Sequence, residues 1–263
     1  MKMSRIHKSS SMWAPRVPDQ RNRHQRNVAC LIKFATKYGV IEAKVAARHL
    51  RVYNDPVNPA NITQESTTPK LLSCRKCRRL SNQFERLRES HPDYWNNPVS
   101  GSGADSCSLM IVGLAPGMHG ANRSGVPFVG DSSGNLLGEV LKASGLVGRV
   151  KITNAVKCLP IKNLPSSREV KNCSRFLVRE IKGHQLNNSP VLLLLGGVAH
   201  RATIGALGGK QSDYRFAHGA VHAMDGVTLI DSYHCSRYNT QTGRLTYQMF
   251  LDVVTAAGNM AYP

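Results

Sequence analysis

The chain has 263 residues, 41% of them hydrophobic, which is enough for one buried core plus an extension and excludes a wholly disordered protein. Its 35 lysine and arginine residues outnumber its 16 aspartate and glutamate residues, giving a net charge of +19 that predicts a polyanionic partner. No apolar run is long enough to cross a membrane, so nucleic acid is favoured over a membrane surface.

The N-terminal part is a basic extension. Residues 1–27 are rich in Arg and Ser, which predicts a disordered arm or, alternatively, an organellar transit peptide. Apolar spacing predicts a helix within residues 28–53, interrupted at Gly39, and residues 54–69 resemble a linker. We therefore expect an extension over residues 1–60 and one folded domain over 61–263. No secretory signal is recognisable, so a cytoplasmic or nucleoid location is expected.

A glycine-rich stretch over residues 109–137 organises the folded domain. Its apolar start, residues 109–112, predicts a buried strand, and the polar loop that follows carries His119, Asn122, Arg123, Phe128 and Asp131. Helical spacing resumes at Leu136, with Gly145 as the expected C-cap. A loop between a strand and a helix is where open α/β sheets bind ligands, although a purely structural turn remains an alternative.

The rest of the domain alternates strands and helices. Strands are predicted at residues 150–156 and 191–195, and helices from near Ser166 and over 198–207. Two further β-type runs flank the turn signal Asp225-Gly226, and a last helix is expected over 247–257. This alternation predicts an α/β fold with a mostly parallel sheet between helical layers.

Histidines outside the main motifs are expected to be structural. His200 is predicted to lie at the surface or in helix packing. His218 and His222 share one face of a predicted strand, but no third metal ligand is evident, so a metal pair is not expected there.

Four of the seven cysteines have the spacing Cys-x2-Cys-x80-Cys-x14-Cys, formed by Cys74, Cys77, Cys158 and Cys173. The first pair alone is compatible with a metal site, a redox pair or chance. Zinc sites normally use two close pairs, whereas a [4Fe–4S] cluster needs four thiolates without compact spacing. Cys30, Cys107 and Cys235 are expected to be non-ligands.

Two motifs resemble one known family. The run from Gly113-Leu114-Ala115-Pro116 through His119-Gly120-Ala121-Asn122-Arg123 to Pro127-Phe128 and Gly130-Asp131 is similar to the first motif of the type B, or fifth-family, uracil-DNA glycosylases. The closing run from His234 to Thr246 resembles that family's His-Pro-Ser loop, with Cys235 where proline is usual. The cysteine spacing also matches the cluster arrangement of the fourth and fifth families.

The resemblance implies a monofunctional enzyme that flips uracil out of DNA and hydrolyses its glycosidic bond, with hypoxanthine or other deaminated bases as further substrates. It implies a four-stranded parallel sheet in an αβα sandwich, a [4Fe–4S] cluster held by the four cysteines, and a monomer that binds single- or double-stranded DNA. The expected site residues fall into three groups. For substrate binding they are Gly113, Ala115, Phe128 and Asn154, for catalysis His234, Asn122 and Asp131, and for DNA binding Ser236, Arg237, Tyr238 and Arg244.

Within these expectations, the residue that positions the water is the least defined. Leu114 and Ala115 stand where other branches carry an acidic or amide side chain, so Asn122 is the first choice and Asp131 the second. An iron–sulfur DNA-binding protein without glycosylase activity is the alternative function, and a radical or redox enzyme is a further one.

Overall fold

The computed structural model describes residues 71–263. The predicted basic arm, its helix, the linker and the expected boundary at residue 60 all lie outside the described residues. Within residues 71–263, no helix combines the length and the apolar character that a membrane span requires.

A five-stranded sheet forms the centre of the described domain, in the order β2-β1-β3-β5-β4. Its strands are β1 (Leu109–Gly113), β2 (Val150–Asn154), β3 (Val191–Leu195), β4 (Val221–Met224) and β5 (Val227–Ser232). The first four in the sheet order are parallel, as predicted, and β4 pairs antiparallel with β5 as an additional edge strand. Asp225 and Gly226 join these two strands with positive φ angles of 47° and 77°, the combination that a tight hairpin turn requires.

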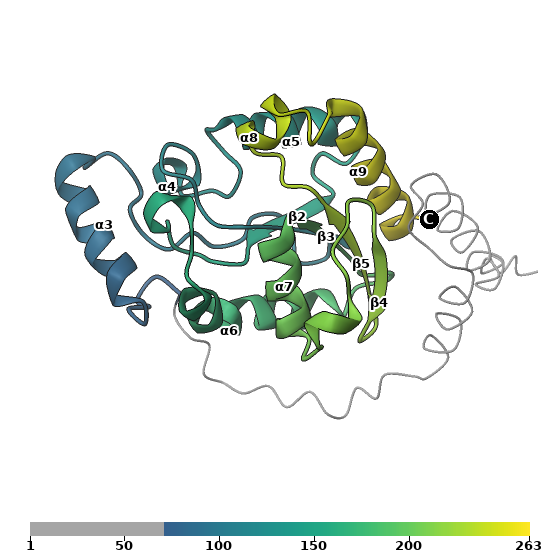
Figure 1. Cartoon of the computed structure of the whole chain (residues 1–263), viewed down its shortest axis with the longest axis horizontal. Helices are drawn as coiled ribbons and strands as arrows, with labels where there is room; N and C mark the ends of the chain where they lie inside the picture. Colours follow the sequence, from purple (N-terminus) through teal and green to yellow (C-terminus); the bar gives the residue numbers. More distant parts are fainter. Residues whose placement is uncertain (1–70) are drawn as a thin grey trace, which may run out of the picture.

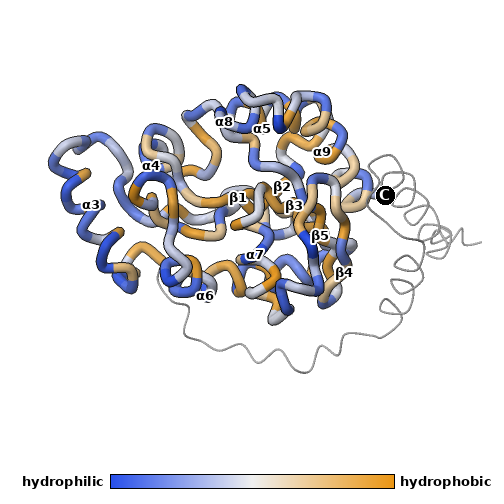
Figure 2. The backbone as a smooth tube through the Cα atoms, in the orientation of Figure 1, coloured by the Kyte–Doolittle hydropathy of each residue, from blue (hydrophilic) through white to orange (hydrophobic). Residues whose placement is uncertain are grey.

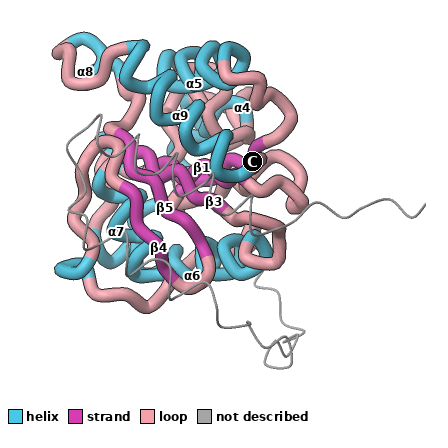
Figure 3. Tube along the Cα trace, turned by 90° about the vertical axis from the view of Figure 1, so that its right-hand side faces the viewer, coloured by secondary structure: helices cyan, strands magenta, loops and turns pink. Residues whose placement is uncertain are grey.

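Two helical layers enclose the sheet (Figures 1 and 3). Helices α5 (Ser132–Ala143) and α9 (Tyr247–Ala261) cover one face, and α6 (Ser167–His184) and α7 (Gly197–Ala206) cover the other. Successive residues of a strand point to opposite faces, so a strand buried on both sides is apolar throughout. Leu109 and Ile111 accordingly join the core under α5 and α9, whereas Met110 and Val112 join the core over α6 and α7. Figure 2 shows this apolar centre.

The remaining elements are short or peripheral. They are α3 (Arg78–Ser90), which lies at one end of the molecule in Figure 1, α4 (Ala121–Ser124), the 3-10 turns η2 (Ile161–Asn163) and η3 (Gln211–Asp213), and α8 (Arg237–Gln241). The predicted capping box at the start of α6 is present, because Ser166 and Glu169 exchange side-chain to backbone hydrogen bonds.

Two predicted boundaries were wrong, and one short helix was not predicted. Helix α5 begins at Ser132 rather than near Leu136, because the Asp131 carboxylate caps it by accepting the Gly134 N–H at 2.9 Å. The glycine-rich loop contains the short helix α4, and β2 ends at Asn154 instead of Val156. The start of α5 was missed because apolar periodicity does not register a cap formed by a polar side chain.

Candidate active site

A pocket of about 500 Å³ lies at the carboxyl ends of the parallel strands. Each strand supplies part of the wall: Leu114 and Ala115 follow β1, Asn154 ends β2, Gly196 follows β3 and His234 follows β5. This edge is where open α/β sheets bind ligands. The other lining residues are Pro116, Gly117, Ala121, Phe128, Asp131, Ser133, Pro160, Asn163, Leu195, Gly197, Val198, Phe216, Tyr233, Ser236, Asn239 and Arg244.

Gly113 brings an aromatic ring and an amide together at the pocket floor. A methyl group on Gly113 would lie 2.5 Å from the Asn154 Oδ1 and 2.6 Å from the Phe128 ring, so only glycine fits between them. Asn154 is 3% exposed, and its Oδ1 has no hydrogen-bond partner among residues 71–263. A buried amide oxygen without a partner is costly unless a ligand donates to it. The Asn154 Oδ1 can therefore accept a hydrogen bond from a ligand in the pocket.

Phe128 is held in a strained backbone conformation beside the pocket. Its φ is 58°, in the left-handed region, which costs a residue with a side chain about 1–2 kcal/mol. The Phe128 ring lies nearly parallel to the His234 ring, with centroids 6.1 Å apart and an interplanar angle of 26°. Strain of this kind persists where the surroundings fix the residue and often marks a functional position.

His234 enters the pocket on the loop after β5. Its backbone carbonyl accepts a 2.7 Å hydrogen bond from Asn239 Nδ2, which holds the loop, and its ring Nδ1 is buried without a partner in the described part of the chain. Burial lowers the pKa of His234 below its ordinary value of 6.5, with a smaller opposing effect of the Asp131 charge. The imidazole is therefore neutral at pH 7 and carries one N–H donor.

This lowered pKa predicts a pH dependence of stability. Below pH 6.5 the unfolded state binds a proton at His234 that the folded state does not bind. The free energy of unfolding is therefore highest above pH 6.5 and falls as the pH decreases from 6.5 through the depressed pKa. The slope contributed by this group is at most about 1.4 kcal/mol per pH unit. Urea unfolding at several pH values from 5 to 8 measures it, with His234→Gln as the comparison. The two proteins should differ in slope only below pH 6.5, and equal slopes there would refute the prediction.

Asp131 lies between the pocket and the glycine-rich loop. One carboxylate oxygen caps α5, and a Cβ on Gly120 would lie only 2.2 Å from the other, so the loop backbone packs directly against the Asp131 side chain. Asp131 lines the pocket. The hydrogen bond from the Gly134 N–H fixes the orientation of the Asp131 carboxylate at the pocket wall.

Asn122 lies apart from the pocket wall. It is fully buried on α4, and its Nδ2 donates a 2.9 Å hydrogen bond to Oδ1 of Asn96. Asn96 also contacts α4 through its backbone N–H, which donates to the Asn122 carbonyl at 3.3 Å. The structure thus joins Asn122 to the segment that precedes β1, and it brings Asp131 rather than Asn122 to the pocket.

The rim of the pocket is polar and basic. Ser236 caps α8 by accepting the Asn239 N–H at 3.4 Å and lines the pocket. Arg237 and Tyr238 begin α8, and Tyr238 is 71% exposed. The guanidinium of Arg244 lies 4.6 Å above the Tyr233 ring. Arg244 lines the pocket, and Arg237 and Tyr238 directly follow Ser236 of the lining; an exposed aromatic ring and two arginines there suit contact with a phosphate backbone and bases.

The four predicted cysteine ligands converge on one small cavity at a distance from the pocket. Cys74 and Cys77 precede α3, Cys158 follows β2 and Cys173 lies on α6, and all four line a cavity of about 20 Å³. All four thiols are free. Cys107 and Cys235 are buried outside this group, as expected for non-ligands, and Cys30 lies outside the described residues.

The surroundings of these sulfurs suit a bound cation. Burial, with smaller contributions from the neighbouring thiols, raises the pKa of Cys173 to about 11 and also raises that of Cys158. Deprotonation of Cys158 and Cys173 therefore requires a positively charged group beside them. Donors also face the sulfurs: Arg175 Nη2 lies 3.1 Å from Cys74 Sγ, and the Lys157 backbone N–H lies 3.2 Å from Cys173 Sγ. The donor set fits a metal or iron–sulfur cluster.

Several residues of the pocket lining were not among the site residues expected from the sequence. Phe216 and Asn163 line the pocket from segments with no motif, and no local signal identifies them. Asn239 lies within the closing motif, five residues after His234. An amide at this spacing could have been predicted to hold the histidine loop.

The sequence of the chain was compared with family models and with known proteins. The model of the uracil DNA glycosylase superfamily matches residues 100–257, the region that builds the sheet and the pocket. The chain belongs to this superfamily. The type-5 uracil-DNA glycosylase of Thermus thermophilus is 38% identical over 218 residues, covering 75% of this chain and 98% of the relative. The corresponding protein of Pyrobaculum aerophilum is 35% identical, covering 72% and 89% respectively.

A more distant relationship within the superfamily is visible as well. The type-4 uracil-DNA glycosylase of Archaeoglobus fulgidus is 36% identical over 132 residues, covering 49% of this chain and 58% of the relative. The longer type-5 matches agree with the family that the motifs predict.

Proposed function

We propose that this superfamily member is a monofunctional uracil-DNA glycosylase that excises uracil from DNA and leaves an abasic site. Membership of the superfamily and similarity to type-5 enzymes over three quarters of the chain support the reaction class. The single observation that supports the substrate is the buried Asn154 amide, whose Oδ1 has no partner within residues 71–263 and faces Phe128 across Gly113.

Recognition follows from the chemistry of the base edge. A flipped uracil presents an O4 acceptor and an N3–H donor, which match the Nδ2 and Oδ1 of Asn154. Cytosine presents an amino group and an unprotonated N3 at the same places, so both contacts are mismatched. Hypoxanthine presents the same carbonyl and N–H pair as uracil, which supports it as a second substrate.

The bond that breaks is the one between the sugar C1′ and the base nitrogen. Negative charge develops on the departing uracil and positive charge on the sugar. His234 donates its single N–H to the uracil carbonyl as the charge appears, and the DNA phosphates stabilise the sugar. The water oxygen bonds to C1′, and its proton leaves to solvent or to the released base. Asp131, which lines the pocket, is better placed than Asn122 to orient this water.

DNA is held by the rim. Ser236, Arg237 and Tyr238 enter the space that the flipped base vacates, and Arg244 contacts the phosphates. The position of Ser236 and Arg244 in the pocket lining supports these roles. The net charge of +19 supplies the sequence-independent attraction to phosphate. The enzyme acts as a monomer on DNA of the cytoplasm or nucleoid.

Phe128→Ala is expected to lower kcat/KM for uracil excision roughly 5- to 150-fold. Stacking of a base on an aromatic ring contributes about 1–3 kcal/mol, and this energy offsets part of the cost of flipping. Single-turnover excision from a double-stranded oligonucleotide measures the effect. Phe128→Tyr keeps the ring and should stay near the wild-type rate, so an alanine variant of equal activity would remove Phe128 from the site.

We further propose that Cys74, Cys77, Cys158 and Cys173 hold a [4Fe–4S] cluster. Four free thiols around one cavity, with hydrogen-bond donors at their sulfurs, support this assignment. The cluster joins the segment before α3 to the end of β2 and to α6, which gives it a structural role.

Cys173→Ser is expected to remove most of the bound iron and to lower stability, because one thiolate ligand is lost. Iron and acid-labile sulfide per chain, with the visible absorbance, are the measurements. Cys107→Ser is the matched control, since Cys107 is also buried but lies outside the group. Full iron content in Cys173→Ser would overturn the ligand assignment.

The reaction is tested with oligonucleotides that carry uracil, hypoxanthine or cytosine at one position. Cleavage by alkali after incubation, at uracil and hypoxanthine but not at cytosine, is the expected result. Binding of all three DNAs without base release would instead identify a DNA-binding protein on this scaffold.

A further inference from the structure

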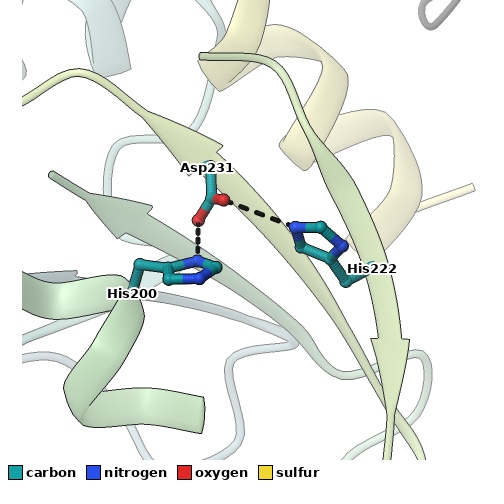
Figure 4. A group of neighbouring side chains, drawn as sticks. All are labelled: His200, His222 and Asp231. Carbon is teal, nitrogen blue, oxygen red and sulfur yellow. Dashed lines mark hydrogen bonds and ion pairs between the residues drawn. The ribbon is translucent and has the colours of Figure 1, made fainter. Parts of the chain in front are cut away.

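Three side chains outside the proposed active site and the cysteine group converge in the interior. They come from three elements: His200 from α7, His222 from β4 and Asp231 from β5 (Figure 4). The His200 Nδ1 lies 2.9 Å from Asp231 Oδ1, and the His222 Nε2 lies 3.5 Å from Asp231 Oδ2. Their side chains are 2%, 17% and 0% exposed, in the order His200, His222, Asp231.

Hydrogen bonds leave this cluster incompletely satisfied. His222 Nε2 and Asp231 Oδ2 are both buried, and neither has a hydrogen-bond partner among the described residues. His200 Nε2 lies 2.9 Å from the Tyr214 carbonyl, which accepts only, so this nitrogen carries a proton. A neutral His200 therefore turns the lone pair of Nδ1 toward a carboxylate oxygen. A second proton on His200 would satisfy this contact but would leave His222 Nε2 and Asp231 Oδ2 without a hydrogen bond.

We propose that His200 Nδ1, His222 Nε2 and the Asp231 carboxylate bind one divalent transition metal ion, with Zn²⁺ as the best fit. Two imidazoles and a carboxylate are a common ligand set for zinc, with a fourth position open to water. The three donor atoms lie within 4.8 Å of one another. Ligands at about 2.0–2.2 Å from zinc lie roughly 3.5 Å apart, so small side-chain movements close the site.

The surroundings agree with a metal site. The Tyr214 carbonyl fixes the ring orientation and tautomer of His200, as carbonyls commonly do for metal-bound histidines. A cation also compensates the charge of Asp231, a carboxylate with no exposed surface. His222 is the most exposed of the three and marks the side from which an ion enters.

This metal would join α7 and the β4–β5 hairpin directly behind the pocket. The His200 ring contacts the Phe216 ring with centroids 5.6 Å apart, and Phe216 contacts Tyr233 with centroids 6.1 Å apart. Both of these aromatic residues line the pocket. His218, the other histidine near this hairpin, accepts the Tyr233 N–H at its Nδ1 and lies outside the trio. Metal binding at these three side chains does not depend on the proposed reaction.

Zinc binding to the full chain with its cluster intact tests the proposal. Protein is dialysed against buffered micromolar Zn²⁺, and zinc and iron per chain are measured by elemental analysis. Wild type and the control His218→Gln should bind about one zinc per chain more than His222→Gln and Asp231→Asn. At about one hundred times the Kd, zinc should raise the Tm of wild type and of the control by roughly 5–10 °C.

The variants separate this site from zinc held elsewhere. Zinc bound by displaced cluster cysteines would persist in His222→Gln, so equal zinc in wild type and this variant overturns the proposal. An unchanged Tm of wild type with zinc overturns it as well. If Asp231→Asn does not fold, His222→Gln decides, because its side chain is the least buried of the three.

Discussion

Replacement of His234 with alanine is expected to lower the rate of uracil excision by about 10²–10³-fold. The reason is the loss of a positioned donor at the carbonyl where negative charge develops, an effect worth roughly 2.7–4 kcal/mol in enzymes that stabilise such charge. The ring is neutral at pH 7 because burial lowers its pKa, and the Asn239 amide holds its loop. Single-turnover rates at saturating enzyme measure the step directly.

Two controls accompany this variant. His91→Ala removes a histidine ring outside the pocket lining and should leave the rate within about twofold. The iron content of His234→Ala should equal that of wild type, because His234 does not line the cysteine cavity. Excision at the wild-type rate by His234→Ala would show that another group stabilises the leaving base.

Replacement of Asn154 with alanine is expected to lower kcat/KM for uracil by about 10²-fold. Two hydrogen bonds to the base edge are lost at a buried position, on the order of 2–3 kcal/mol together. The variant should also lose part of its preference for uracil over cytosine, whose amino group and unprotonated N3 mismatch the Asn154 amide. Excision from oligonucleotides that carry uracil or cytosine measures the loss of discrimination together with the rate.

The matched control is Asn135→Ala, an exposed asparagine on α5 outside the pocket lining. It should leave kcat/KM within about twofold. A result in which Asn154→Ala retains full activity and full selectivity would show that the base is read by other groups, and it would remove the main support for the substrate assignment.

Much of the fold was accessible from the sequence. The apolar run Val191–Leu195 predicted both ends of β3 correctly, because a strand covered by helices on both faces has no polar positions. The Asp225-Gly226 signal placed the β4–β5 hairpin, and the Ser166–Glu169 spacing placed the start of α6. These features depend on residues close together in the chain.

Other features depend on contacts across the fold. Asp131 forms the N-cap of α5 and also lines the pocket, which the loop sequence alone did not indicate. Asn122 donates a hydrogen bond to Asn96, which lies in a different segment of the chain. The spacing of residues within the motif could not predict that this contact holds Asn122 away from the pocket wall. Asp231 lies on a strand between the helix of His200 and the strand of His222, and only the sheet order brings the three together.

The resemblance supplied roles that periodicity did not. The proximity of Gly113, Phe128 and Asn154 agrees with the substrate group that the motifs implied, and the convergence of four cysteines agrees with the implied ligand set. Cys235 replaces the usual proline, and its buried thiol donates to the Ser133 carbonyl at 3.6 Å, a contact to the α5 N-terminus that proline lacks. This contact gives the loop an alternative anchor.

The most direct measurement is the release of free base from a double-stranded oligonucleotide with one uracil, by protein purified without air. Mass spectrometry of the products before any alkali treatment should show free uracil and an intact strand with an abasic site, as hydrolysis without strand cleavage requires. Bound but unaltered DNA, from protein with its full iron content, would contradict the account.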